Sequence, residues 1–347
     1  MKILVIRYRF FGDTILTVPF LEKLKEFYPD SEVHVLVSPQ SGQVLKNCPY
    51  IDKTIDFLLE EKFHKYEKNK NSSNSFLDLI FKLRKEKFDK VFILKRSFSS
   101  ALISFLAGIP ERIGFDTELR GFLLTKRIKF NPKISEVLNF FACLSKEFLN
   151  EKATSKKYFW ASQEEKQKAL NLIQKLNEKN PNTKKIILHA KPSHPFKKWH
   201  MGKWASLIKL LKKKNYQIIF SGIASEKKYY DQIEKLSENK IDLKLFETDN
   251  NLRENMAFYE LCDLAVCVDS GPMHLAAATA IKTLGLFGPT DSNRWHPWSN
   301  KAEILTAKEE LSCRPCNLKI SCNNLRPCLN NLEAKEVFNK IEEMLLL

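Results

Sequence analysis

The chain has 347 residues, which is long for a single core and fits two domains of ordinary size. Its 57 Lys and Arg against 41 Asp and Glu leave a net charge of +16, which favours an anionic partner: nucleic acid, an acidic membrane surface or a phosphorylated substrate. The first apolar run ends at Arg7, and no later run is long enough to span a bilayer. We therefore expect a cytoplasmic protein without a signal peptide or a transmembrane helix.

The N-terminal segment predicts a buried strand followed by a helix. The strand runs from Lys2 to Ile6, a loop passes through Gly12, and the helix runs from about Asp13 to Tyr28. Asp13 thus lies beyond the carboxyl end of the first strand, where open α/β sheets bind ligands. Two interpretations stay open: a carboxylate that caps the helix, or a general base.

Four cations of the first half are candidates for binding an anionic ligand. Lys95 and Arg96 follow the expected strand Lys90–Leu94, at its carboxyl end, where they could hold a carboxylate or a phosphate. Arg112 and Arg120 are further candidates for the same task. The alternative for all four is ordinary surface charge.

A polar stretch from Asn150 to Lys157 predicts an interdomain linker, which gives domains 1–157 and 158–330. In the second domain, Lys197 and Lys198 follow the expected strand Lys185–His189. A lysine at such a strand end can neutralise a leaving diphosphate without a metal ion. Glu226 follows the next strand, either as a carboxylate for a sugar diol or as a first-turn residue favoured by the helix dipole.

The most informative stretch is a strand, a polar turn and a helix in the second half. The strand Leu264–Val268 ends at Asp269, and Ser270, Gly271 and Pro272 suit the start of a helix. Backbone N–H groups at such a helix start can bind a phosphate, although an ordinary βαβ corner has the same pattern. His274 lies one turn into this helix. In the helix before the strand, Met256 could pack against a base.

Four cysteines cluster near the end of the chain: Cys313, Cys316, Cys322 and Cys328. Zinc sites usually have two closely spaced pairs, and only one is present, so the spacing argues against a metal site and a structural zinc stays open as the alternative. The chain has no G-x-G-x-x-G, no P-loop and no Asp-x-Asp. These absences argue against a dinucleotide oxidoreductase, a P-loop nucleotidase and a carboxylate clamp for a metal-bound nucleotide sugar.

The sequence DSGPMHLAAA at 269–278, followed by LFGPTD at 286–291, resembles the signature of the bacterial lipopolysaccharide heptosyltransferases, glycosyltransferase family 9. Gly12-Asp13 and Lys197-Lys198-Trp199 match further motifs of that family. The resemblance implies a GT-B fold, with two Rossmann-like domains facing across a cleft. It also implies an inverting, metal-independent transfer in which Asp13 is the base, Lys197 stabilises the leaving group and Lys198 is its variable partner. Where relatives carry a Gly- or Ser-rich turn, this chain has residues 189–193, HAKPS.

From these patterns we expect the following site residues: Asp13 and Lys197 for catalysis; Gly12, Lys198, Glu226, Met256, Asp269, Ser270, Gly271, Pro272, Met273 and His274 for the donor; Lys95, Arg96, Arg112 and Arg120 for the acceptor. The resemblance implies ADP-L-glycero-D-manno-heptose as donor and the Kdo or heptose of the inner core as acceptor. We expect a monomer at the anionic cytoplasmic face of the inner membrane, no nucleic acid partner, and a closing helix, 331–347, that packs back on the first domain. The alternatives are a glycosyltransferase with another nucleotide sugar and a non-catalytic polyanion-binding protein.

Overall fold

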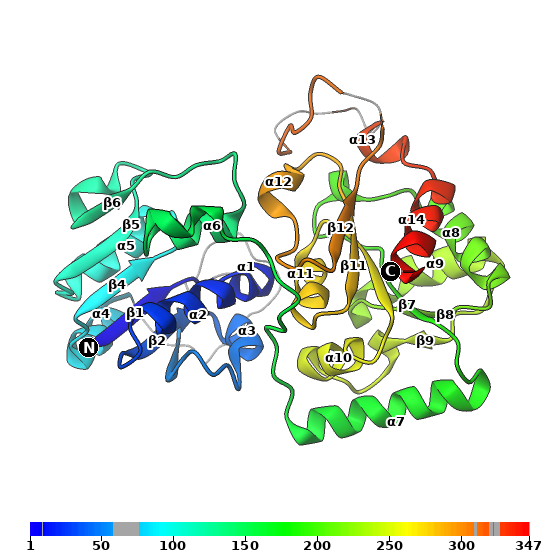
Figure 1. The fold of residues 1–347 in the computed structure, drawn as a ribbon, viewed down its shortest axis with the longest axis horizontal. Helices are drawn as coiled ribbons and strands as arrows, with labels where there is room; N and C mark the ends of the chain where they lie inside the picture. Colours follow the sequence, from blue (N-terminus) through cyan, green and yellow to red (C-terminus); the bar gives the residue numbers. More distant parts are fainter. Residues whose placement is uncertain (9, 58–75, 309–310, 319–321, 323–326, 347) are drawn as a thin grey trace. The chain divides into compact units, whose positions relative to one another are not determined.

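The computed structural model describes residues 1–8, 10–57, 76–308, 311–318, 322 and 327–346. The chain divides into two compact units, Met1–Glu151 and Lys152–Leu347, called here the first and second units (Figure 1). Each unit is built on one parallel six-stranded sheet with helices, and the central strands of both sheets are the near-continuous apolar runs expected of strands buried on both faces. Among the described residues, no helix combines the length and the apolar character needed to cross a membrane.

The first sheet has the order β3-β2-β1-β4-β5-β6. Its strands are β1 (Lys2–Ile6), β2 (Glu32–Val37), β3 (Lys53–Asp56), β4 (Lys90–Ile93), β5 (Glu111–Phe115) and β6 (Lys126–Ile128). Its helices are α1 (Phe11–Ile15), α2 (Val18–Phe27), α3 (Pro39–Gly42), α4 (Phe76–Glu86), α5 (Phe98–Leu106) and α6 (Glu136–Ala142), with 3-10 turns η1 (Gln43–Leu45), η2 (Arg120–Leu123) and η3 (Lys146–Asn150). Because the strand order reverses between β1 and β4, the carboxyl ends of these two strands mark the place where such sheets bind ligands.

The helix expected after β1 is divided in two. Asp13 lies in the first turn of α1, and a new helix, α2, begins at Val18. Pro19 lies in the first turn of α2 and has no N–H to donate to a preceding carbonyl, which explains why the helix restarts there.

The second sheet has the order β12-β11-β10-β7-β8-β9 and reverses between β7 and β10. Its strands are β7 (Lys185–His189), β8 (Gln217–Phe220), β9 (Leu243–Lys244), β10 (Leu264–Val268), β11 (Lys282–Leu286) and β12 (Ala302–Leu305). The helices are α7 (Gln163–Lys179), α8 (Met201–Lys213), α9 (Lys227–Ser237), α10 (Leu252–Tyr259), α11 (Gly271–Ala278), α12 (Ser292–Trp295), α13 (Pro327–Asn330) and α14 (Ala334–Leu346), with 3-10 turns η4 (Pro195–Lys197), η5 (Ala224–Glu226) and η6 (Leu245–Glu247).

The closing helix packs within the second unit, which corrects the expectation that it returns to the first domain. Helix α14 lies beside α8 (Figure 1), and Val337, Phe338 and Ile341 are buried in the core that also contains Trp199 and Trp204. These apolar side chains recur on one face of the helix, so burying them against α8 accounts for its position. The pattern alone did not specify which core would receive this face.

The division between the units falls after Glu151 rather than after Lys157. The linker-like residues belong to the second unit because Thr154 O accepts a hydrogen bond from Asn300 N at 3.1 Å. Tyr158 N donates to Ala278 O at 2.8 Å. The polar composition of the stretch predicted an exposed connection but not these backbone partners.

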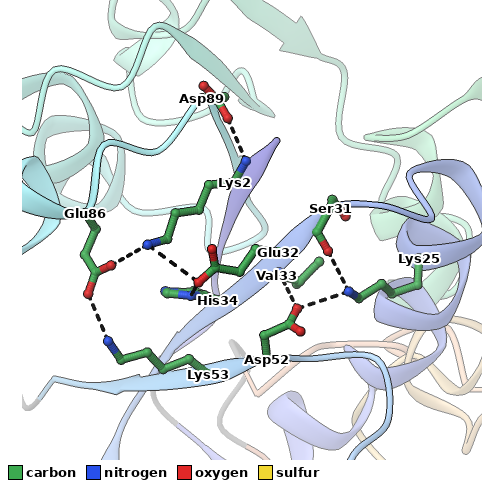
Figure 2. A network of polar contacts seen from close by, with 10 residues as sticks. All are labelled: Lys2, Lys25, Ser31, Glu32, Val33, His34, Asp52, Lys53, Glu86 and Asp89. Carbon is green, nitrogen blue, oxygen red and sulfur yellow. Dashed lines mark hydrogen bonds and ion pairs between the residues drawn. The ribbon is translucent and has the colours of Figure 1, made fainter.

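Figure 2 shows a polar network at the edge of the first sheet where the strands begin. Glu86, at the end of α4, accepts hydrogen bonds from Lys2 on β1 and, at 2.9 Å, from Lys53 on β3. These two ammonium groups lower the pKa of Glu86 to about 2. Asp52 receives the N–H of Val33 at 2.7 Å in the same region. The network ties three strand starts to α4, at the edge opposite the strand ends that carry the candidate site residues.

Candidate functional site

The junction of β10 and α11 has a helix start that is open to an anion. Ser270 occupies the N-cap position, as expected, but its hydroxyl makes no capping hydrogen bond and instead donates to Val268 O at 2.9 Å. Pro272 lies in the first turn of the helix. The first N–H groups of α11 thus receive no side-chain cap from Ser270, and a bound phosphate could accept from them.

Lys197 is held directly beside this helix start. It ends η4, the turn that follows β7, and its Nζ lies 2.7 Å from Oδ2 of Asp269 at the end of β10. The hydroxyl of Thr290 donates to the same carboxylate oxygen. The side chain of Asp269 is only 6% exposed and that of Lys197 is 19% exposed. An ammonium group has three N–H donors, so Lys197 can pair with Asp269 and still donate to a diphosphate.

Two further lysines after β7 surround one aromatic ring. The ammonium groups of Lys191 and Lys198 lie 5.6 and 5.5 Å from the ring centroid of Tyr229 on α9. Lys191 also acts electrostatically on Glu226. The sequence predicted Lys198 and missed Lys191 and Tyr229. Lys191 could have been predicted from its position just beyond the end of a strand. Nothing in the sequence distinguishes Tyr229 from other buried aromatic residues on a helix.

Glu226 directly precedes α9, so it lies at the start of a helix, which is one of its two predicted placements. It ends η5, and its Oε2 accepts the N–H of Ile223 at 3.2 Å. Burial raises the pKa of Glu226, and the Ile223 N–H and Lys191 partly offset this effect. A Cβ added to the neighbouring Gly222 would lie 2.6 Å from the Tyr230 ring and 2.9 Å from Glu226, so this close approach requires glycine. The contact of Glu226 with a ribose stays a prediction.

A buried polar cluster fixes the loop after β7. His189 shares a hydrogen bond with Ser221 O at 2.8 Å through its Nδ1, and burial lowers the pKa of His189 to about 4. Tyr230 donates its hydroxyl proton to Ser221 O and accepts from the N–H of Ala190. The imidazole is therefore neutral at physiological pH, and the strand end that carries Lys197 is anchored by neutral hydrogen bonds.

Three predicted donor residues are buried in the second unit. Met256 and Met273 are completely buried, and His274 is 7% exposed. The sulfur of Met273 fills the space beside Gly285 on β11. The structure thus gives both methionines packing roles, and the expected contact of Met256 with a base has no support in its placement.

In the first unit, Asp13 pairs with an arginine that the sequence analysis missed. Arg7, directly after β1, lies with its Nη2 3.2 Å from Oδ2 of Asp13 and 3.8 Å from Oε1 of Glu136. The N-cap position of α1 belongs to Phe10, so Asp13 does not cap the helix. Gly12, predicted as a donor residue, is buried within α1. An ion pair at the carboxyl end of β1 fits a carboxylate that is held in a defined orientation.

A family model described as glycosyltransferase family 9 (heptosyltransferase) matches residues 76–325. The chain belongs to this family. A lipooligosaccharide heptosyltransferase 2 from Campylobacter jejuni is 27% identical over 99% of this chain and 98% of its own. The solved structure of E. coli ADP-heptose LPS heptosyltransferase II is similar, with a TM-score of 0.75 at 22% identity, covering 100% of this chain and 99% of its own.

An E. coli heptosyltransferase solved with ADP-2-deoxy-2-fluoro heptose is also similar, with a TM-score of 0.71 at 17% identity over 99% of each chain. The two α/β units and these structural matches confirm the predicted GT-B fold class. The protein is thus a glycosyltransferase, as the resemblance implied.

The four predicted acceptor cations of the glycosyltransferase separate into two pairs. Lys95 lies over the ring of Tyr8, at 3.8 Å from its centroid, and Arg96 pairs with Glu136 at 3.4 Å. Both follow β4, which pairs with β1, the strand directly before Arg7. Their placement agrees with the predicted edge, although an acceptor contact stays a prediction.

The other two cations bind local carbonyl groups, and full burial argues against the expected acceptor contact only for Arg120. Arg120 is fully buried and donates to the carbonyls of Phe115 and Lys95. Burial lowers its pKa to about 10. Arg112 donates to the carbonyls of Leu123 and Ile109, at 2.7 and 2.6 Å. Sequence spacing could not reveal that local carbonyl groups take up both guanidinium groups.

The cysteine cluster packs beside the loop that carries Thr290. Asn317 N donates to Pro289 O at 2.8 Å. Burial, followed by the neighbouring thiols, raises the pKa of Cys328 to about 11. Within the described residues, no group of three or more His, Cys, Asp or Glu side chains is arranged to hold a metal ion. The structural zinc stays a prediction.

Proposed function

We propose that this glycosyltransferase moves heptose from ADP-L-glycero-D-manno-heptose to the Kdo or heptose of the lipopolysaccharide inner core, with inversion and without a catalytic metal ion. The observation that carries the proposal is the Lys197–Asp269 ion pair at the open start of α11. The names of the relatives support the sugar and the acceptor, and the ligand of one structural neighbour supports the donor. The absence of an Asp-x-Asp pair and the position of Lys197 support metal independence.

The second unit would bind the donor. The diphosphate accepts hydrogen bonds from the N–H groups that begin α11, and Lys197 provides a positive charge next to them. Asp269 keeps the ammonium group in place, and Thr290 orients Asp269. Lys191 and Lys198, whose ammonium groups lie near the ring of Tyr229, add further positive charge to the segment after β7.

The first unit would bind the acceptor and supply the base. Asp13 takes the proton of the acceptor hydroxyl, and that oxygen forms a bond to the anomeric carbon as the bond from this carbon to the diphosphate breaks. ADP leaves with its charge stabilised by Lys197 and α11. A single displacement of this kind inverts the anomeric centre. Arg7 acts as a positioning residue in this proposal, because its guanidinium pairs with the carboxylate of Asp13.

The net charge of +16 supports work at the anionic cytoplasmic face of the inner membrane, where lipid-linked acceptors are presented. We also propose that the enzyme is a monomer.

The direct test is release of ADP from ADP-heptose in the presence of a heptose-free core acceptor, with and without EDTA. Acceptor-dependent release that EDTA leaves unchanged supports the proposal. If only another nucleotide sugar releases its nucleotide, the enzyme uses that donor instead of ADP-heptose. Salt-sensitive binding of polyanions without any turnover would show that the protein is a polyanion-binding protein and not this enzyme.

A further inference from the structure

The first unit contains a cavity of about 950 Å³ that the proposed mechanism does not use. Its walls are the segment that follows η2, from β6 to Ile134, and the segment from α6 through η3. The lining residues are Lys126, Arg127, Ile128, Lys129, Phe130, Asn131, Pro132, Ile134, Asn139, Ala142, Leu144, Ser145, Lys146, Glu147 and Leu149. A volume of this size is sufficient for a ligand larger than a single sugar.

The charge around the cavity is strongly positive. Lys126, Arg127, Lys129 and Lys146 line it, against one carboxylate, Glu147. Within the described part of the chain, none of these four cations forms an ion pair with a carboxylate, whereas Lys2 and Lys53 of the same unit do. Four unpaired cations on one concave surface favour an anionic ligand with more than one charged group.

The cavity also has apolar walls and a fixed shape. Ile128, Phe130, Ile134, Ala142, Leu144 and Leu149 contribute carbon surface. Asn139 is buried on α6, accepts the N–H of Asn131 at 2.9 Å and donates to Asn131 O at 2.8 Å. This double hydrogen bond fastens one wall to the other. Unpaired cations beside apolar surface suit an amphiphile rather than a free anion.

A chain of ion pairs connects this cavity to the predicted base. The guanidinium of Arg96 lies 4.1 Å from the ring centroid of Phe130 in the cavity wall and pairs with Glu136. Glu136 also pairs with Arg7, which holds Asp13. Glu136 begins α6, the helix that lines the cavity with Asn139 and Ala142. The same elements therefore position both the cavity wall and the carboxylate.

We propose that this cavity binds the phosphorylated, acylated part of a glycolipid acceptor, away from the hydroxyl that reacts. The four cations bind its phosphates, and the apolar wall receives its hydrocarbon surface. The identity of the ligand as the acceptor rests on the proposed function. Binding energy from such a remote part of the substrate can be used to place the reacting hydroxyl at Asp13.

The test measures binding of bisphosphorylated lipid A in detergent micelles to the full chain. We expect the double variant Lys126→Glu/Lys129→Glu to lose at least about tenfold in affinity, since each reversal removes one attraction and adds one repulsion. The matched control is Lys82→Glu/Lys85→Glu, which makes the same change in net charge on α4 of the same unit. A second variant, Ala142→Trp, fills the cavity without changing the charge and should also weaken binding.

Two further probes separate the possible ligands. Dephosphorylated lipid A and inorganic phosphate should each bind wild type at least about tenfold more weakly than bisphosphorylated lipid A. Equal loss in the α4 control, or wild-type affinity in both cavity variants, overturns the proposal. Inorganic phosphate binding as tightly as lipid A also overturns it, because the apolar wall would then contribute nothing.

Turnover distinguishes this inference from the function on which it rests. If ADP-heptose is consumed and the cavity variants keep the wild-type KM for a lipid-linked acceptor, the cavity assignment is wrong and the function stands. If no nucleotide sugar is consumed and the cavity variants still lose affinity for lipid A, the function is wrong and the cavity is a glycolipid site. The KM for the donor should be the same in wild type and in all three variants.

Discussion

Lys197 Nζ lies 2.7 Å from Oδ2 of Asp269, and this ion pair joins the loop after β7 to the end of β10 at the point where the second sheet reverses its strand order. The pair places a fixed positive charge next to the start of α11. Four predictions test this ion pair and two features of the first unit, the predicted base Asp13 and the ion pairs of Glu86.

Replacing Lys197 by Ala should lower kcat by about 10²–10³-fold, because the leaving diphosphate loses its nearest positive charge. The KM for the donor should rise as well, since the ground-state diphosphate carries charge too. Steady-state kinetics with ADP release as the readout measures both. Lys213→Ala, at the exposed end of α8, is the matched control. A Lys197→Ala enzyme as fast as this control would remove Lys197 from the mechanism.

Replacing Asp269 by Asn should destabilise the second unit, by roughly 3–5 kcal/mol at most, because it leaves the Lys197 ammonium without its buried partner. Urea unfolding of the single variants and of Lys197→Ala/Asp269→Asn gives the coupling between them. The double variant should be more stable than the sum of the two single losses predicts. Strict additivity would show that the pair does not act as a unit.

Replacing Asp13 by Asn should lower kcat by about 10²–10⁴-fold and leave ADP affinity unchanged, because the amide cannot accept the proton of the acceptor hydroxyl. ADP binding by calorimetry and turnover by ADP release separate the two effects. Asp30→Asn, at an exposed position of the same unit, should behave as wild type. Near-normal turnover in Asp13→Asn would require another base.

The network of Glu86, Lys2 and Lys53 should make stability depend on pH in the acid range. The pKa of Glu86 is lowered from its ordinary 4.5 to about 2 in the folded protein, so its ion pairs stabilise the fold fully above pH 4.5 and this contribution is lost as the pH falls toward 2. Glu86→Gln should cost about 1 kcal/mol at pH 7, and the difference from wild type should shrink below pH 4.5.

Urea unfolding at pH 7, 5, 4 and 3 measures this difference, with Asp30→Asn as the exposed control. A constant difference across that range would contradict the assigned role of Glu86.

Much of the second unit's site was predictable from sequence. Buried strands that end in polar turns predicted where Lys197, Asp269 and Ser270 would lie, because carboxyl ends of parallel strands meet at one edge. The partners were not predictable. Nothing in the spacing indicates that the Ser270 hydroxyl bonds backward to Val268 instead of capping α11, or that Lys197 pairs with Asp269.

The arginines show the limit most clearly. Arg112 and Arg120 bind local carbonyl groups, whereas Arg7, directly after β1, contacts the predicted base. Which partner each guanidinium finds depends on how the loops fold, which residue type and position do not encode. The packing of α14 was missed for a related reason: an apolar face shows that a helix is buried on that side, but not which hydrophobic core it packs against.

The indole N–H of Trp199 donates to Leu332 O at 2.9 Å, so the residue two positions after Lys197 is tied to the connection that leads into α14. Lys203, one turn into α8, reaches Glu333 in the same connection. Deleting the residues from Leu332 onward would therefore remove the partner of Trp199 and loosen the segment that carries Lys197, although the deleted part contains none of the predicted site residues. A protein fused to the C-terminus would need a spacer long enough for α14 to stay packed against α8.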